Sequence, residues 1–134
     1  MDDSTRPRLT ALRNGLLNLH KSLMDSERAA YERDVARITS AGQYLGLVLN
    51  DPWFQWLRDL SQFVVRIDVA LDDKEQPATA ADAERLISAA RALLSPAQEG
   101  PDFGRRYYDA MQRDPGVVLA HRDMMQVLGG LSER

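Results

Sequence analysis

Leucines near the start of the chain recur at alternating intervals of three and four residues. The repeat comprises Leu9, Leu12, Leu16, Leu19 and Leu23. This spacing places all five side chains on one side of an α-helix, as in the seam of a helical bundle. Similar helical spacing recurs in residues 53–71, 86–94 and 117–128, and no segment shows the two-residue alternation of a half-buried strand. We therefore predict an all-α fold.

Prolines and charged loops mark where the helices begin and end. The pairs Asp51-Pro52 and Asp114-Pro115 each indicate a helix start, because aspartate caps a helix N-terminus and proline suits the first helical position. We expect helices over residues 7–38, 43–50, 52–71, 80–94, 102–112 and 115–128. The predicted architecture is an up-and-down bundle of four main helices plus one or two short helices, with the helix over residues 52–71 as its central member.

The chain length of 134 residues suits a single domain with one core. Residues 1–6 are expected to form a disordered tail and residues 129–134 a frayed C-terminus. The hydrophobic fraction of 44% and the charged fraction of 28% are those of a soluble globular protein. No apolar run approaches the ~20 residues that span a bilayer, and no signal peptide is visible. We therefore expect a cytoplasmic protein with no membrane partner.

The chain carries few chemically reactive residues. It has no cysteine, its only histidines are His20 and His121, and its net charge is -3. Thiolate chemistry is therefore excluded, and nucleic acid is not an expected partner. The sequence contains no Glu-x-x-His pair of a di-iron bundle, no Gly-x-Ser-x-Gly elbow and no glycine-rich phosphate loop. We predict no catalytic residues, no metal and no cofactor.

One polar stripe is the candidate for a buried site. His20, Glu27 and Tyr31 share a face of the first helix, and Asp68 of a later helix is a candidate neighbour. One interpretation is a small-ligand or metal site built from two histidines and a carboxylate. The other, which we favour, is a structural network that links neighbouring helices at the edge of the core. It predicts that Glu27 and Tyr31 are buried and hydrogen-bonded.

Two aromatic segments are candidate partner-binding surfaces. Arg105, Arg106, Tyr107 and Tyr108 combine residue types that are enriched at protein interfaces, with a solvated helix face as the alternative. Phe54 lies about 100° off the seam of its helix. This position predicts either an exposed patch for a partner or a side chain that the preceding short helix covers.

Four motifs occur in the first half of the chain: LLxLHK at residues 16–21, DxERxxYE at 25–32, DPWFxWLRxLS at 51–61 and ID at 67–68. Together they resemble a group of small, uncharacterised bacterial proteins that are all-helical. The resemblance implies a helical fold. It brings with it no activity and no functional residues.

The predicted first helix is about 48 Å long, whereas the helix over residues 52–71 is about 30 Å long. The excess carries Tyr31, Val35 and Ile38, which need cover. The short helix over residues 44–49 could provide this cover within one chain, and a second copy could provide it in a two-fold dimer.

We predict a non-enzymatic helical protein that acts through protein–protein contacts or self-association, as a homodimer. Met124 and Met125 offer adaptable apolar surface for such contacts. The alternatives are a small-ligand or metal-binding bundle and an enzyme of unrecognised type.

Overall fold

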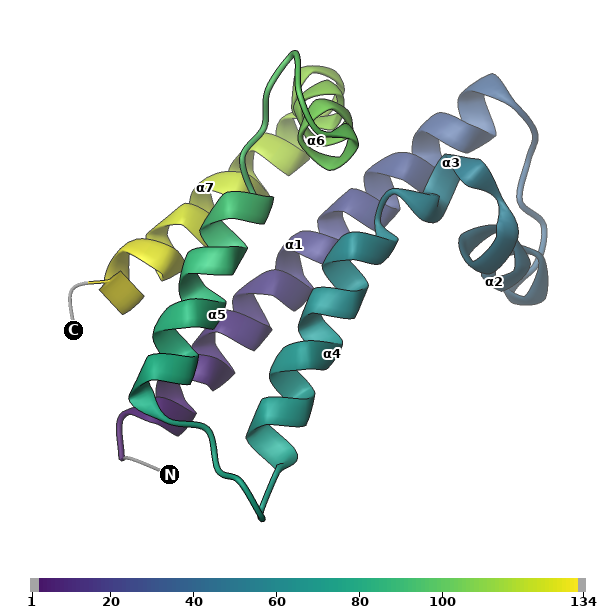
Figure 1. Cartoon of the computed structure of the whole chain (residues 1–134). Coiled ribbons are helices and arrows are strands. Elements are labelled where there is room, and N and C mark those ends of the chain that lie inside the picture. Colours follow the sequence, from purple (N-terminus) through teal and green to yellow (C-terminus); the bar gives the residue numbers. More distant parts are fainter. Residues whose placement is uncertain (1–2, 133–134) are drawn as a thin grey trace.

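The computed structural model describes residues 3–132. Within this range the chain forms seven helices and no strand, which confirms the all-α prediction (Figure 1). The helices are α1 (Thr5–Asp34), α2 (Ala41–Asn50), α3 (Pro52–Gln55), α4 (Arg58–Asp72), α5 (Ala80–Leu93), α6 (Asp102–Arg113) and α7 (Pro115–Ser132). No helix in the described range is long and apolar enough to cross a membrane.

The core forms around α1, which contacts α4, α5 and α7 (Figure 1). The five leucines of the predicted seam are fully or almost fully buried there. They pack with Leu60 and Ile67 of α4, Ile87 of α5 and Leu128 of α7. The prediction that residues 52–71 form the central helix is therefore wrong. The longest helix takes that place, since its seam of five buried leucines packs against three neighbouring helices.

Residues 52–71 do not form one continuous helix. The chain breaks between α3 and α4, where the amide N–H groups of Leu57 and Leu60 donate to the carbonyls three residues earlier. These tighter bonds rotate the chain relative to a straight α-helix. The break resolves a conflict in the sequence: Phe54 turns toward α1 and α2, while Trp56 and Leu57 enter the main core.

The first helix ends at Asp34, four residues earlier than predicted. The chain then folds back, and α2 covers the end of α1. Tyr31 and Ile38 are buried there with Phe54, against partly buried side chains of α2 and α3. The short helix, one of the two predicted forms of cover, therefore buries Tyr31 and Ile38 within one chain, whereas Val35 remains 56% exposed.

Both predicted loose ends are partly helical: residues 3–4 form a turn, and the helices include residues 5–6 and 129–132. Thr5 and Arg6 belong to α1, and α7 continues through residues 129–132. The two helix ends are joined because Arg8, which is buried, donates from Nη2 to the Leu131 carbonyl at 3.1 Å and forms an ion pair with Glu84. The predictions of a tail over residues 1–6 and a frayed end over 129–134 are corrected for these residues. Residues 1–2 and 133–134 lie outside the described range.

The predicted helix starts are confirmed. Asp51 Oδ1 accepts a hydrogen bond from the Trp53 amide at 2.8 Å, and Asp114 Oδ1 accepts one from the Gly116 amide at the same distance. A reciprocal pair of hydrogen bonds between Thr79 and Asp82 caps α5. Each aspartate satisfies an amide that the helix itself leaves without a partner.

Candidate interaction surface on α4

Two valines of α4 lie outside the core. The inward face of this helix buries Leu60, Val64 and Ile67 against α1. Val65 and Val69, one helical turn apart, are 57% and 62% exposed. We call this pair the valine ridge. Because each side chain is branched at Cβ and rigid in a helix, the ridge is a fixed apolar projection.

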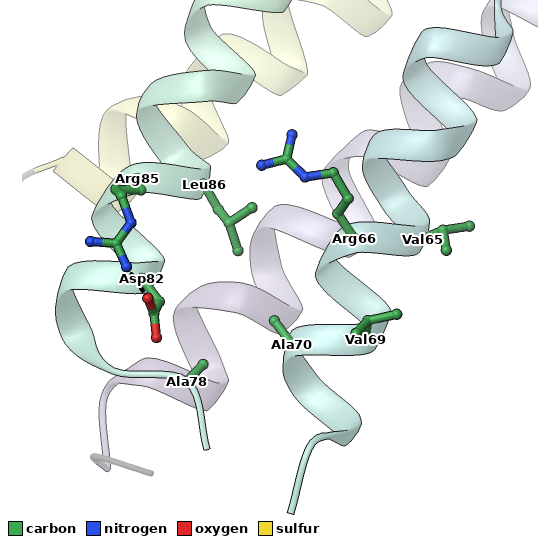
Figure 2. Close-up of a pocket in the computed structure, with 8 residues that line it drawn as sticks. All are labelled: Val65, Arg66, Val69, Ala70, Ala78, Asp82, Arg85 and Leu86. Carbon is green, nitrogen blue, oxygen red and sulfur yellow. Dashed lines mark hydrogen bonds and ion pairs between the residues drawn. The ribbon is translucent and has the colours of Figure 1, made fainter. Parts of the chain in front are cut away.

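A hollow of about 450 Å³ lies between α4 and α5, beside the valine ridge. Figure 2 shows Leu86 of α5 and Arg66 of α4 reaching into the gap between the helices, whereas Val65 and Val69 point away from α5. The remaining lining residues are Ala70, Ala78, Asp82 and Arg85. The two alanines are too small to fill the gap, so the hollow stays open to solvent.

Only some of the charged residues that line this hollow have an ionic partner. Asp82 forms an ion pair with Arg85, and a hydrogen bond from the Thr79 backbone amide lowers its pKa, so the carboxylate stays ionised. Arg66 has no carboxylate partner among residues 3–132, and its guanidinium lies 5.1 Å from the centre of the Phe63 ring. A second hollow of about 450 Å³ continues along α4 and α5 beyond Arg66. Arg66 therefore lies between two hollows with no ionic partner in the described part of the chain.

The opposite side of the valine ridge is acidic. A hollow of about 350 Å³ is lined there by the ridge with Asp68, Asp72 and Asp73. Asp68 forms an ion pair with Arg13, and Asp73 accepts hydrogen bonds from two amides of the following loop. Asp72 has no hydrogen-bond or ion-pair partner in the described part of the chain. The ridge is thus bordered by an unpaired arginine on one side and an unpaired aspartate on the other.

The polar stripe of α1 links neighbouring elements at Glu27 and Tyr31. Both side chains are buried, as predicted, but within residues 3–132 only Glu27 has the predicted side-chain hydrogen bond. Glu27 Oε1 accepts a hydrogen bond from Arg113 Nη2 at 2.8 Å, which ties α6 to α1. The Tyr31 ring packs edge-on against Trp53, with ring centroids 5.7 Å apart, and also contacts Phe54.

The other two members of the predicted polar cluster lie apart from Glu27. Asp68 is held by Arg13. His20 is partly buried on α1, and this burial lowers its pKa. No group of three histidine, aspartate or glutamate side chains within residues 3–132 is arranged to hold a metal ion. The structure therefore does not bring His20, Glu27, Tyr31 and Asp68 together as one ligand site.

The predicted arginine–tyrosine patch on α6 is divided between surface and core. Arg105 and Arg106 are exposed, and both pair with Asp102 at 3.2 Å. Tyr108 is partly exposed, but Tyr107 is completely buried. Tyr107 is thus corrected from a partner-binding residue to a core residue. The reason is the strong amphipathic pattern of α6, which turns Tyr107 toward the core together with Phe103.

The prediction that Phe54 binds a partner is also corrected. It is only 2% exposed and contacts the rings of Tyr31 and Tyr44. The short helix α2 covers it, which was the alternative to an exposed patch. The outer side of α2 itself leaves Leu45 and Leu49 exposed, but this helix carries no charged residue.

Comparison with protein-family models, curated proteins and solved structures gives no significant match.

The sequence-based prediction does not include Val65, Arg66, Val69 or Asp72. A signal was nevertheless present, because the seam of this segment passes through Leu60, Val64 and Ile67 and leaves two valines outside it. Apolar residues off the seam, one turn apart, indicate exposed apolar surface. The hollows beside them depend on the distance between α4 and α5, which the spacing along one helix does not determine.

We expect the free energy of unfolding to fall as the pH is lowered from 7 toward 5.5. Burial lowers the pKa of both His20 and His121, so the unfolded chain binds protons at a pH where the folded chain does not. The stabilisation is complete above the unfolded pKa of about 6.5 and is lost as the pH falls below it. Urea denaturation at several pH values between 7 and 5.5 measures this loss of stability.

The double variant His20→Gln and His121→Gln is expected to flatten this dependence. His121 Nδ1 lies 2.5 Å from the Tyr107 hydroxyl, so the variant also disturbs a hydrogen bond, and the comparison uses the slope with pH and not the absolute stability. An unchanged slope would show that other groups cause the effect.

Proposed function

We propose that this chain is a non-enzymatic helical protein that acts through protein–protein contacts at the outer face of α4. The observation that carries the proposal is the valine ridge, exposed between two hollows and bordered by unpaired charges of opposite sign. Apolar projections flanked by polar groups are the usual anatomy of a protein interface.

The chemistry of the surface supports binding over catalysis. The three hollows are lined by valine, alanine, leucine and phenylalanine together with arginine, aspartate and glutamine. None of these lining residues is a histidine, serine, threonine or tyrosine, so the lining lacks a hydroxyl nucleophile paired with a histidine base. Shallow, open hollows beside a ridge suit the side chains of a partner helix better than an enclosed small molecule.

We further infer that α1, α4, α5 and α7 form an up-and-down four-helix bundle. The contacts of α1 with the other three helices and the alternating chain directions in Figure 1 support this arrangement. A bundle of this kind would hold α4 as a rigid element and present its outer face without rearrangement.

A photo-reactive amino acid at position 69 tests the proposed function. A benzophenone side chain in place of Val69 is expected to form a protein adduct on irradiation of the cells that naturally make this protein. The matched control carries the same group in place of Val118, an exposed valine of α7. An adduct at position 69 that is absent at position 118 supports the proposal. No adduct at position 69 contradicts it.

A further inference from the structure

The surface on α4 has a shape that complements itself. It presents one apolar ridge, Val65 and Val69, with a hollow on each side. When two helices pack, the ridge of one lies in the groove beside the ridge of the other. Two copies of this surface can therefore interlock, with the valine ridge of each in a hollow of the other.

The charges beside the ridge also complement each other. Arg66 and Asp72 lie on opposite sides of Val69, so they border different hollows and do not meet within one chain. Each is exposed, and neither has an ionic partner among the residues that the structure describes. A carboxylate from another chain could pair with Arg66, and a cationic side chain from another chain could pair with Asp72.

A two-fold rotation brings the complementary sides together. A rotation of 180° about an axis parallel to α4, lying in the interface, places the Arg66 side of one copy opposite the Asp72 side of the other. The six-residue separation corresponds to about 9 Å along the helix. The Arg66 guanidinium now lies over the Phe63 ring, toward the N-terminal end of α4. The long arginine side chain can reach Asp72 of the second copy once it turns toward the C-terminal end of α4, as arginine does in the ion pairs that flank a parallel helix pair. The nearer Asp68 is already held by Arg13.

We propose that the outer face of α4 binds a second copy of this chain across such a two-fold axis, with Arg66 of each copy paired to Asp72 of the other. This inference rests on the proposed function, which places a protein contact at the same surface. It differs from the dimer suggested by the length of the first helix, because α2 covers the end of α1 within the chain.

Charge reversal tests the pairing. Sedimentation at high micromolar concentration is expected to give the mass of two chains for the wild type. Arg66→Glu places a glutamate opposite Asp72 of the second copy, and Asp72→Arg places an arginine opposite its Arg66. Each variant alone is expected to dimerise about 10- to 100-fold more weakly, because the two-fold axis makes every substitution count twice.

Mixing the two charge-reversed variants provides the decisive measurement. In a mixed dimer the introduced glutamate meets the introduced arginine, and the remaining Arg66 meets the remaining Asp72. Mixing is therefore expected to restore the mass of two chains, which neither variant shows alone. The restoration also shows that both variants are folded. A mixture that remains monomeric overturns the proposed pairing.

The apolar part of the interface has a matched control. Val69→Asp is expected to abolish the dimer, whereas Val118→Asp is expected to leave it intact, since both valines are exposed and lie on different helices. Circular dichroism should show the same helix content for both. A dimer that survives Val69→Asp overturns the proposed interface.

The outcome separates this inference from the proposed function. A monomeric wild type overturns self-association. If position 69 nevertheless forms an adduct with another protein in cells, the proposed function stands with a different partner. An adduct between two copies of this chain supports the proposed function and the dimer. A monomeric wild type that forms no adduct at position 69 contradicts the proposed function and the dimer.

Discussion

Replacing Glu27 by alanine is expected to lower the free energy of unfolding by about 2–3 kcal/mol. Glu27 is buried on α1 and accepts a hydrogen bond from Arg113 of α6 at 2.8 Å. Without the carboxylate, the Arg113 guanidinium keeps only the Ser26 hydroxyl as a hydrogen-bond partner within the described residues. The loss is smaller than for a fully buried pair because Arg113 is 26% exposed and water can reach it. Urea denaturation at neutral pH measures the change.

Asp25→Ala is the matched control for this substitution. Asp25 is on the same helix and forms an ion pair with Lys21, but both side chains are mostly exposed. Exposed pairs of this kind contribute less than about 1 kcal/mol, so the stability should change little. A double-mutant cycle with Arg113→Ala isolates the coupling between Glu27 and Arg113. If Glu27→Ala is as mild as Asp25→Ala, the pair does not stabilise the fold.

The spacing of apolar residues predicts much of the helical core because it reports which side of each helix is buried. The five leucines of α1 and the seam residues of α4 lie where their periodicity places them. The same reasoning finds Glu27 and Tyr31 buried, since they continue an apolar stripe. It does not identify Arg113 as the partner of Glu27, because these residues are 86 positions apart and meet only when α6 docks on α1.

Local conflicts in the sequence limit the prediction elsewhere. The aromatic residues after Pro52 cannot all face one side of a straight helix, and the chain resolves this with a break that periodicity alone does not locate. Tyr107 follows two arginines and resembles an interface residue, but α6 turns it inward against Phe103 and His121. In each case a contact between helices decides the outcome.

The outer face of α4 illustrates the same limit for function. Its valines are visible in the sequence, but their significance depends on Arg66 and Asp72 standing unpaired on opposite sides of them. A carboxylate elsewhere in the chain could have paired with Arg66, as Asp68 does with Arg13. Only the packed structure shows which charges remain available to a partner.

Gly104→Ala is expected to destabilise the protein by about 2 kcal/mol, although alanine normally favours a helix over glycine by about 1 kcal/mol. Gly104 is buried in the first turn of α6, where a Cβ would lie 2.7 Å from the Ser95 carbonyl oxygen. The Gly104 carbonyl also accepts a hydrogen bond from the Ala97 amide at 3.1 Å. Because the added Cβ would meet backbone here, no side-chain rotation can relieve the clash, and either α6 or the loop before it must shift.

Gly130→Ala is the matched control, and we expect it to raise the free energy of unfolding. Gly130 lies inside α7, and a Cβ added there would meet nothing within 4 Å. Only the helix preference then acts, so this variant should gain up to about 1 kcal/mol. Urea denaturation of both variants against the wild type measures the difference. A rigid close approach at Gly104 requires the two substitutions to change stability in opposite directions. If Gly104→Ala also stabilises the protein, the loop at Ser95 moves easily and does not fix the position of α6.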